Sequence, residues 1–107
     1  MPMVREPITP ESAAGLSAAF KALGDPVRLR LLSLIASREG GEACVCELTD
    51  SFDLTAPTIS HHLKVLRESG LVASERRGTW VYYRAEPAVL AQLSDLLAVP
   101  APAGGTA

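Results

Sequence analysis

The chain has 107 residues, of which 48% are hydrophobic, and its formal net charge at pH 7 is −2. This length fits a single domain with a small hydrophobic core. No apolar run is long enough to cross a bilayer, and residues 1–11 contain three prolines without the apolar core of a signal peptide. We therefore expect a cytoplasmic protein that makes no membrane contact and whose two cysteines stay reduced.

The acidic net charge hides a local asymmetry. Residues 57–84 contain five basic and two acidic side chains, whereas the rest of the chain contains five basic and ten acidic ones. Such segregation is typical of a DNA-facing surface on an acidic body, although modest clusters also arise on any solvated face. Residue types and their spacing have to distinguish these two interpretations.

The first half of the chain predicts two helices that follow a flexible tail at residues 1–11. Residues 12–23 form the first helix, because apolar side chains recur every three or four positions and a glycine follows them. Asp25 is the expected N-cap of the second helix, and Pro26 takes its first position. Apolar residues cover most of this second helix, which ends near residue 40, so we expect it at the centre of the core.

The second half of the chain predicts helices, a β-hairpin and a second tail. The expected elements are helices at 46–52, 56–69 and 87–99 and strands at 71–77 and 80–84. Thr55 is the expected N-cap of the middle helix, and Gly70 is its C-terminal stop. Residues 100–107 are rich in alanine, proline and glycine and predict a disordered tail. One folded domain is therefore expected over residues 12–99.

The helix at 56–69 has two chemically different faces. Ile59, Leu63 and Leu66 recur at helical spacing and form a buried face. The opposite face is small and hydrogen-bonding near its N-terminus and basic further along, as a recognition helix in a DNA major groove requires. A solvated amphipathic helix is the alternative interpretation. The candidate DNA-contacting residues of this helix are Thr58, Ser60, His61, Lys64 and Arg67.

The hairpin supplies a second candidate DNA contact. Arg76 and Arg77 immediately precede its glycine turn. A basic ribbon tip beside a recognition helix indicates a wing that lies on the DNA backbone or in the minor groove, so both arginines are DNA-binding candidates. We expect Trp80, Tyr82 and Tyr83 to pack the ribbon, because large aromatic side chains favour strands.

Three motifs together resemble the ArsR/SmtB family of metalloregulatory repressors. They are ALGDPVRLRLL from Ala22, TISHHLKVLRESGLV from Thr58 and RRGTWVYYR from Arg76. The resemblance covers about residues 16–97 and implies a mainly α fold with a β-hairpin wing, a homodimeric winged helix-turn-helix. Members of that family repress metal-resistance operons and leave the DNA when the metal binds.

The resemblance implies a DNA-binding repressor that pairs through its first and last helices. Residues 16–23 and 89–97 would then form the homodimer interface, and both segments carry apolar stripes. Double-stranded operator DNA is the implied partner. His62 lies between the buried and exposed faces of its helix and is expected to hydrogen-bond within the fold. Since both histidines lie on the recognition helix, neither is expected to bind a metal.

Two cysteines stand close together ahead of the recognition helix. Cys44-Val45-Cys46 resembles the Cys-Val-Cys-Asp-Leu-Cys element of arsenic-sensing members of the family, with Thr49 in place of the third cysteine. The resemblance implies that Cys44 and Cys46 bind trivalent arsenic or antimony, the expected inducer, and release the operator; no cofactor is required. Thiolates are soft ligands that select soft ions. Side chains at positions i and i+2 lie on the same side of the backbone only where the chain is extended. One ion can therefore bind both sulfurs only if this segment is not helical, so we expect binding to distort the start of the third helix.

Other interpretations of the cysteines and of the chain stay open. The cysteines could be small buried hydrophobes without an inducer, ligands of another soft metal, or a redox pair with an exposed thiol of low pKa. The zinc ligands that other family members carry on the last helix are missing, because residues 87–99 contain no histidine. No enzyme motif is present. A protein-interaction module is disfavoured by the basic residues of the recognition face and the wing.

Overall fold

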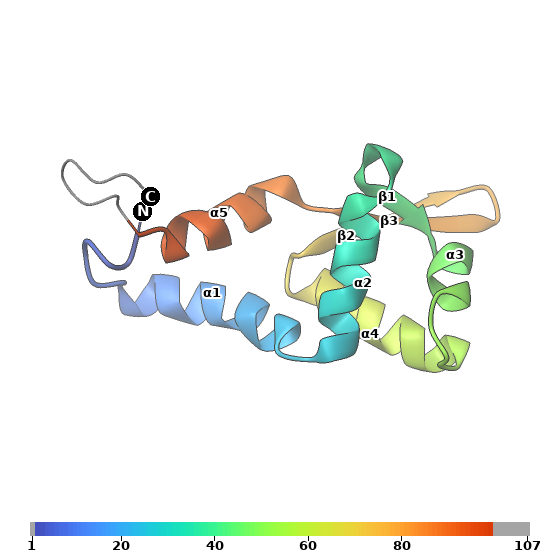
Figure 1. Ribbon diagram of the computed structural model, residues 1–107, viewed down its shortest axis with the longest axis horizontal. Coiled ribbons are helices and arrows are strands. Elements are labelled where there is room, and N and C mark those ends of the chain that lie inside the picture. Colours follow the sequence, from blue (N-terminus) through green and yellow to red (C-terminus); the bar gives the residue numbers. More distant parts are fainter. Residues whose placement is uncertain (1, 100–107) are drawn as a thin grey trace.

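The computed structural model describes residues 2–99 (Figure 1). In chain order, its elements are α1 (Pro10–Leu23), α2 (Pro26–Ser37), the 3-10 turn η1 (Glu39–Gly41), β1 (Glu42–Cys44), α3 (Val45–Asp50), α4 (Ala56–Glu68), β2 (Val72–Arg77), β3 (Trp80–Ala85) and α5 (Pro87–Leu97). None of the helices in this part of the chain is long and apolar enough to span a bilayer. The predicted disordered tail at 100–107 lies outside the described residues.

Helices α1 and α5 lie side by side as an arm at one end of the molecule, and the remaining elements form a body at the other end (Figure 1). Helix α1 begins two residues earlier than expected, because the Thr9 hydroxyl accepts a hydrogen bond from the Ser12 amide at 3.2 Å. The segment before it was expected to be a flexible tail, yet the Met3 amide donates to the Leu96 carbonyl of α5 at 3.0 Å. The N-terminal segment is thus attached to the arm.

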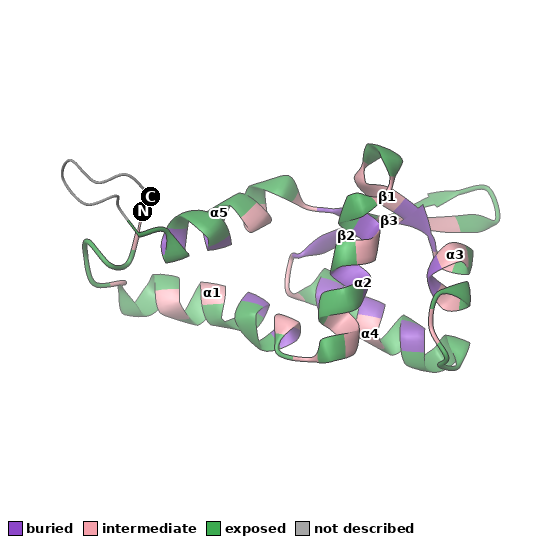
Figure 2. Cartoon of the chain, in the orientation of Figure 1, coloured by how far each residue is buried: buried purple, intermediate pink, exposed green. Residues whose placement is uncertain are grey.

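The core of the body lies where α2, α4 and the sheet meet (Figure 2). Its largest fully buried side chains are Leu31, Ile35, Leu48, Ile59, Leu63, Leu66 and Leu71. The expected central position of α2 is confirmed for one side of that helix only, since Leu29 is 52% exposed. Helix α2 therefore has an outer face that the near-continuous apolar pattern did not predict.

The N-cap of α2 is the predicted Asp25. Its Oδ1 accepts hydrogen bonds from the amides of Arg28 at 3.2 Å and Val27 at 2.8 Å. The backbone hydrogen bond from Arg28, with that from Val27, holds the pKa of the Asp25 carboxyl below its ordinary value despite the opposing effect of desolvation. The cap is consequently strongest when Asp25 is ionised.

Replacing Asp25 by alanine should lower the melting temperature at pH 7 by several degrees, because two amides of the first turn lose their acceptor. A carboxyl whose pKa is lower in the folded than in the unfolded protein stabilises the folded state at pH values above its unfolded pKa of about 4. This stabilisation is lost as the pH falls through the pKa of the folded state. Thermal unfolding of the parent and the variant should therefore differ at pH 7 and converge near pH 2. An equal difference in melting temperature at both pH values would contradict this role of Asp25. The control is Asp53→Ala, which replaces an exposed aspartate.

The sheet has one more strand than the sequence predicted. Strand β1 pairs antiparallel with β3, so the strand order is β1-β3-β2, with Cys44 opposite Tyr82. Strand β1 follows two glycines with positive φ angles, Gly40 at 77° and Gly41 at 69°. It has only three residues, which are too few to show the alternation of apolar and polar side chains that marks a strand. This short strand connects the cysteine pair to the hairpin.

The hairpin of β2 and β3 projects beyond the helices (Figure 1). Its strands pair from Val72 opposite Ala85 to Arg77 opposite Trp80, so the predicted hairpin is confirmed. Tyr82 and Tyr83 are half-buried, in agreement with a packing role, whereas Trp80 is 53% exposed. The expected packing role is therefore wrong for Trp80, because the ribbon tip extends past the helices that could cover it.

Candidate nucleic-acid interface and cysteine pair

Helices α3 and α4 are joined by a short turn and form a helix-turn-helix. The Ser51 amide donates to the Leu48 carbonyl at 3.2 Å where α3 ends, and the Thr55 hydroxyl accepts from the Thr58 amide at 3.4 Å where α4 begins. The predicted inner face of α4, formed by Ile59, Leu63 and Leu66, is completely buried. These contacts fix the rotation of α4 about its axis and therefore decide which side chains face solvent.

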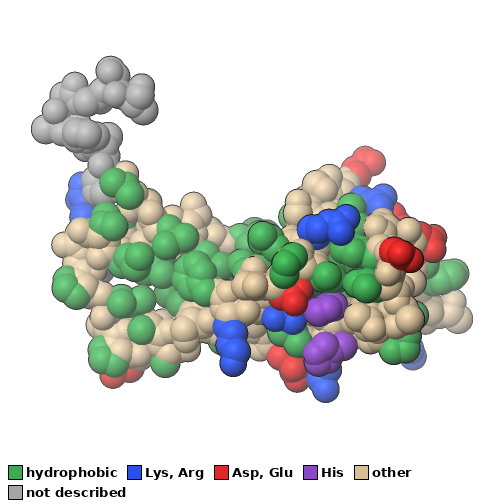
Figure 3. Space-filling view, turned by 60° about the horizontal axis from the view of Figure 1, so that its bottom comes forward, with side chains coloured by type: hydrophobic (Ala, Val, Ile, Leu, Met, Phe, Trp, Pro, Cys, Tyr) green, Lys and Arg blue, Asp and Glu red, His purple; other side chains and the backbone are tan. Residues whose placement is uncertain are grey.

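The outer face of α4 carries every candidate that the sequence placed there. Thr58, Ser60, His61, Lys64 and Arg67 are all exposed. The hydroxyls of Thr55 and Thr58 lie 2.8 Å apart, so the Thr58 side chain also takes part in the cap. In the view of Figure 3 the two histidines lie close to lysine and arginine side chains, with a few acidic groups beside them.

The two histidines have different surroundings, as expected. His61 is exposed, whereas His62 is half-buried and its Nδ1 lies 3.3 Å from Nη1 of Arg28. Arg28 also donates from Nε to the Ala22 carbonyl at 2.7 Å, so its side chain joins α2, the end of α1 and α4. A guanidinium only donates hydrogen bonds, so Nδ1 of His62 is the acceptor in this contact. The predicted hydrogen bond of His62 within the fold is confirmed.

The two wing arginines also differ. Arg76 is exposed and forms no ion pair within residues 2–99. The Arg77 guanidinium donates to both carboxylate oxygens of Glu42 at 2.7 and 2.8 Å, and its Nε donates to Glu75. Its Cζ lies 4.5 Å from the ring centre of Tyr82. No sequence signal indicated Glu42, because it stands 35 positions before Arg77 on a strand that the pattern did not reveal.

The cysteines lie at the boundary between β1 and α3. Cys44 is buried and extended, with φ −71° and ψ 144°, whereas Cys46 is exposed in the first turn of the helix. The Cys44 sulfur is the N-cap: it accepts a hydrogen bond from the Cys46 amide at 3.4 Å. Glu47 completes the cap by accepting from the Cys44 amide at 3.1 Å, and it also pairs with Arg38 at 2.9 Å.

The two thiols are close enough to influence each other. Hydrogen bonding with the Cys44 thiol, followed by desolvation, raises the pKa of the Cys46 thiol above its ordinary value. Thr49, at the place of the absent third cysteine, donates its hydroxyl to the Val45 carbonyl at 3.0 Å. No group of three His, Cys, Asp or Glu side chains suited to a metal ion occurs among residues 2–99. Within this region the pair therefore supplies two ligands and no third.

The helix-turn-helix of α3 and α4, the exposed polar face of α4 and the projecting hairpin of β2 and β3 define a winged helix-turn-helix protein. Comparison with known proteins agrees. The family model described as bacterial regulatory proteins of the arsR family matches residues 25–74. The chain therefore belongs to the arsR family of bacterial regulatory proteins, and its relatives are transcriptional regulators rather than enzymes.

Similar proteins include regulators of arsenic resistance. The chain is 49% identical over 86 residues to an arsenic resistance transcriptional regulator of Pseudomonas putida, an alignment that covers 80% of this chain and 61% of that protein. It is 42% identical over 78 residues to the arsenical resistance operon repressor of Escherichia coli, an alignment that covers 73% of this chain and 65% of that protein. A crystal structure of a possible transcriptional regulator for arsenical resistance superposes with a TM-score of 0.64 at 38% identity, covering 71% of this chain and 76% of that one.

Proposed function

We propose that the chain is a repressor that binds a nearly palindromic double-stranded operator as a homodimer and acts in the cytoplasm, where a bacterial operator lies. The observation that carries the proposal is the outer face of α4, which presents hydrogen-bonding groups and cations beside an exposed wing. Ser60 and His61 would reach base edges in the major groove, and Thr58 would contact the DNA near the helix N-terminus. Lys64 and Arg67 would contact phosphates, as would Arg76 and Arg77 on the wing.

The test of this proposal is binding to DNA from upstream of the protein's own gene. Fluorescence anisotropy with a labelled duplex should show tighter binding to that DNA than to a random duplex of equal length, with a strong dependence on salt. Equal affinity for the two duplexes at every salt concentration would contradict a recognition role for α4.

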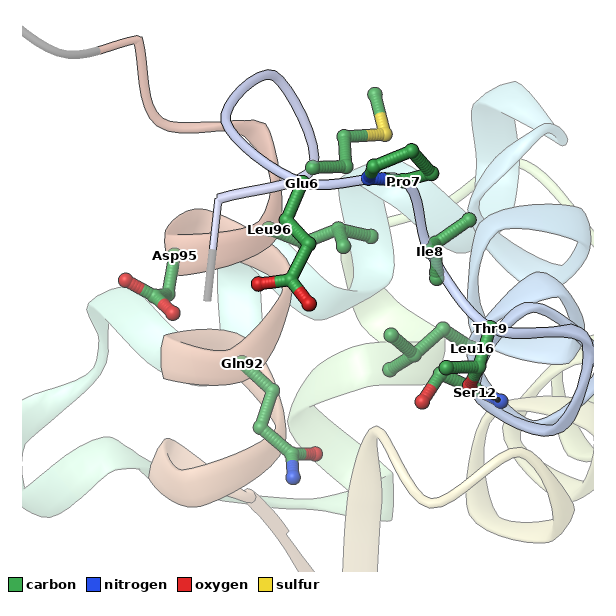
Figure 4. A pocket seen from close by; sticks show the side chains of 10 residues that line it. Glu6, Pro7, Ile8, Thr9, Ser12, Leu16, Gln92, Asp95 and Leu96 are labelled. Carbon is green, nitrogen blue, oxygen red and sulfur yellow. Dashed lines mark hydrogen bonds between the residues drawn. The ribbon is translucent and has the colours of Figure 1, made fainter.

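The proposed dimer interface is the arm formed by α1 and α5. A hydrophobic area covers this end of the molecule (Figure 3). Its exposed apolar residues are Met3, Val4, Phe20, Leu97 and Val99. The arm is also incompletely packed within one chain: a cavity of ≈ 220 Å³ lies between the N-terminal segment and both helices, with Ile8, Leu16 and Leu96 among its lining residues (Figure 4). A second copy would bury this surface and match two half-sites on the DNA.

Replacing Phe20 and Leu97 together by glutamate should give a folded monomer, because four charges would then face one another across the two-fold axis. Sedimentation equilibrium at micromolar concentration should show a dimer for the parent and half that mass for the variant. Leu29→Glu, which changes an exposed leucine outside the arm, should remain a dimer. A monomeric parent, or a dimeric double variant, would rule out this interface.

We further propose that trivalent arsenic or antimony is the inducer and that it binds Cys44 and Cys46. Arsenite can condense with two thiols, forming two As–S bonds and releasing two water molecules while one hydroxyl stays on the arsenic. The extended backbone at Cys44 supports this chemistry, because the pair already straddles the helix start and its sulfurs are neighbours. An external thiol could replace the remaining hydroxyl. The soft sulfur pair favours a soft ion over zinc held by carboxylates.

Two features favour an inducer site over the alternatives for the cysteines. A structural role does not account for Cys46, which is exposed. A redox sensor uses a thiol of low pKa, whereas hydrogen bonding with Cys44 raises the pKa of Cys46. Titration with arsenite should therefore consume both thiols at one arsenic per chain, as counted with a thiol reagent. Two thiols still reactive at saturating arsenite would exclude the site.

The position of the pair suggests how binding would affect DNA affinity. An ion on Cys44 competes with the Cys46 amide for the sulfur and so weakens the cap of α3. Helix α3 packs against α4, and β1 pairs with the wing strand β3. The distortion predicted from the sequence would then be confined to the first turn of α3 and would have contact routes to both DNA-binding elements.

A further inference from the structure

The Arg77 side chain connects the two outer strands of the sheet. It leaves β2, passes over the Tyr82 ring on the middle strand and reaches Glu42 on β1. Nη1, Nη2 and Nε are all engaged with carboxylate oxygens, and one face of the guanidinium covers the ring. In this conformation the cation is already neutralised by two acidic neighbours, Glu42 and Glu75.

Arg76 provides the contrast within the same hairpin. Adjacent residues of a strand project from opposite faces, so Arg76 points away from the Glu42 cluster. It is exposed and has no ion-pair partner in the described region. Of the two wing arginines, only Arg77 has to give up protein contacts before its guanidinium can bind anything else.

We propose that Glu42 sets the affinity for DNA by competing with a backbone phosphate for the Arg77 guanidinium. Carboxylate and phosphate both bind a guanidinium through the same paired N–H donors, so the edge that holds Glu42 cannot hold a phosphate at the same time. Hydrogen bonding from Arg77 lowers the pKa of Glu42, so the competitor remains charged at neutral pH. The inference rests on the proposed contact between the wing and DNA.

If Glu42 competes with a phosphate for Arg77, removing the charge of Glu42 should increase the affinity for DNA. Glu42→Gln keeps the size of the side chain and one acceptor oxygen but loses the charge, so it should raise operator affinity by about threefold or more at low salt. The salt dependence should become steeper, because Arg77 would release counterions on binding instead of exchanging one intramolecular anion for a phosphate. Trp80, the chain's one tryptophan, lies opposite Arg77 in the hairpin, so its fluorescence reports whether the wing is engaged.

Two comparisons separate competition from a general charge effect. Glu39→Gln removes an exposed carboxylate three residues away that forms no ion pair in the described region, so its gain should be clearly smaller. In an Arg77→Ala background the Glu42→Gln gain should fall to the level of Glu39→Gln. Circular dichroism of every variant checks that the fold is kept.

Other outcomes would overturn the inference. A loss of affinity in Glu42→Gln would mean that Glu42 holds the wing in its binding conformation. A gain that persists without Arg77 would mean a general charge effect. If Arg77→Ala alone left operator affinity and its salt dependence unchanged, the contact of Arg77 with DNA would be wrong, while binding through α4 and Arg76 stood. A parent protein that did not distinguish operator from random DNA would instead contradict the proposed function itself.

Discussion

Replacing Lys64 by alanine should weaken binding to every DNA duplex by roughly tenfold or more at low salt, because each half of a dimer loses one phosphate contact. The slope of log affinity against log salt should fall in magnitude by about two, one for each half-site. Lys64 is exposed on the outer face of α4, so its removal leaves the buried face intact. Anisotropy titrations at several salt concentrations give both quantities.

His61 should behave differently from Lys64. If its ring reaches a base edge, His61→Ala should cost roughly fivefold or more on the operator and much less on random DNA. Arg5→Ala removes an exposed cation from the N-terminal segment of the arm and serves as the control, with operator affinity unchanged. Unchanged operator affinity in both Lys64→Ala and His61→Ala would mean that α4 is not the recognition helix.

Replacing Cys44 and Cys46 together by serine should leave operator binding in place and abolish the response to arsenite. A serine hydroxyl can accept the hydrogen bond that the Cys44 sulfur accepts now, so the cap of α3 is kept while the soft ligands are lost. The two thiols are the only ones in the chain, and no cluster of three metal-ligating side chains exists in the described region to replace them.

The control for the thiol variant is Thr49→Ser, which changes the position of the missing third cysteine without adding a thiol. It should respond to arsenite like the parent, since the Thr49 hydroxyl is engaged with the Val45 carbonyl. A double cysteine variant that still released its DNA on addition of arsenite would exclude the site. Thr49→Cys should in turn bind arsenite more tightly, because it offers a third sulfur.

The parts of the fold that depend on neighbouring residues in the sequence could be predicted. The stripe of Ile59, Leu63 and Leu66 determines the buried face of α4, and the exposed candidates follow from it. Asp25 and Thr55 act as caps because their side chains reach amides only two or three residues further on. Local periodicity and local hydrogen bonding carry this information.

The parts that depend on distant contacts could not be predicted. Strand β1 is three residues long and exists through its pairing with β3, some forty positions later. Glu42 meets Arg77 only because that strand is present. The exposure of Trp80 follows from how far the hairpin extends beyond the helices, which its aromatic composition does not encode. Sequence spacing alone also left the conformation of Cys44 open until the strand was seen.

We propose that the protein holds an operator until a soft trivalent ion occupies its thiol pair. An inducer can release DNA only if it binds the DNA-free conformation more tightly than the bound one. The most direct measurement is anisotropy of the labelled upstream duplex, preformed with the reduced parent protein and titrated with arsenite. The anisotropy should fall to that of free DNA as one arsenic per chain is bound. A complex that remains intact at saturating arsenite, while both thiols are consumed, would contradict it.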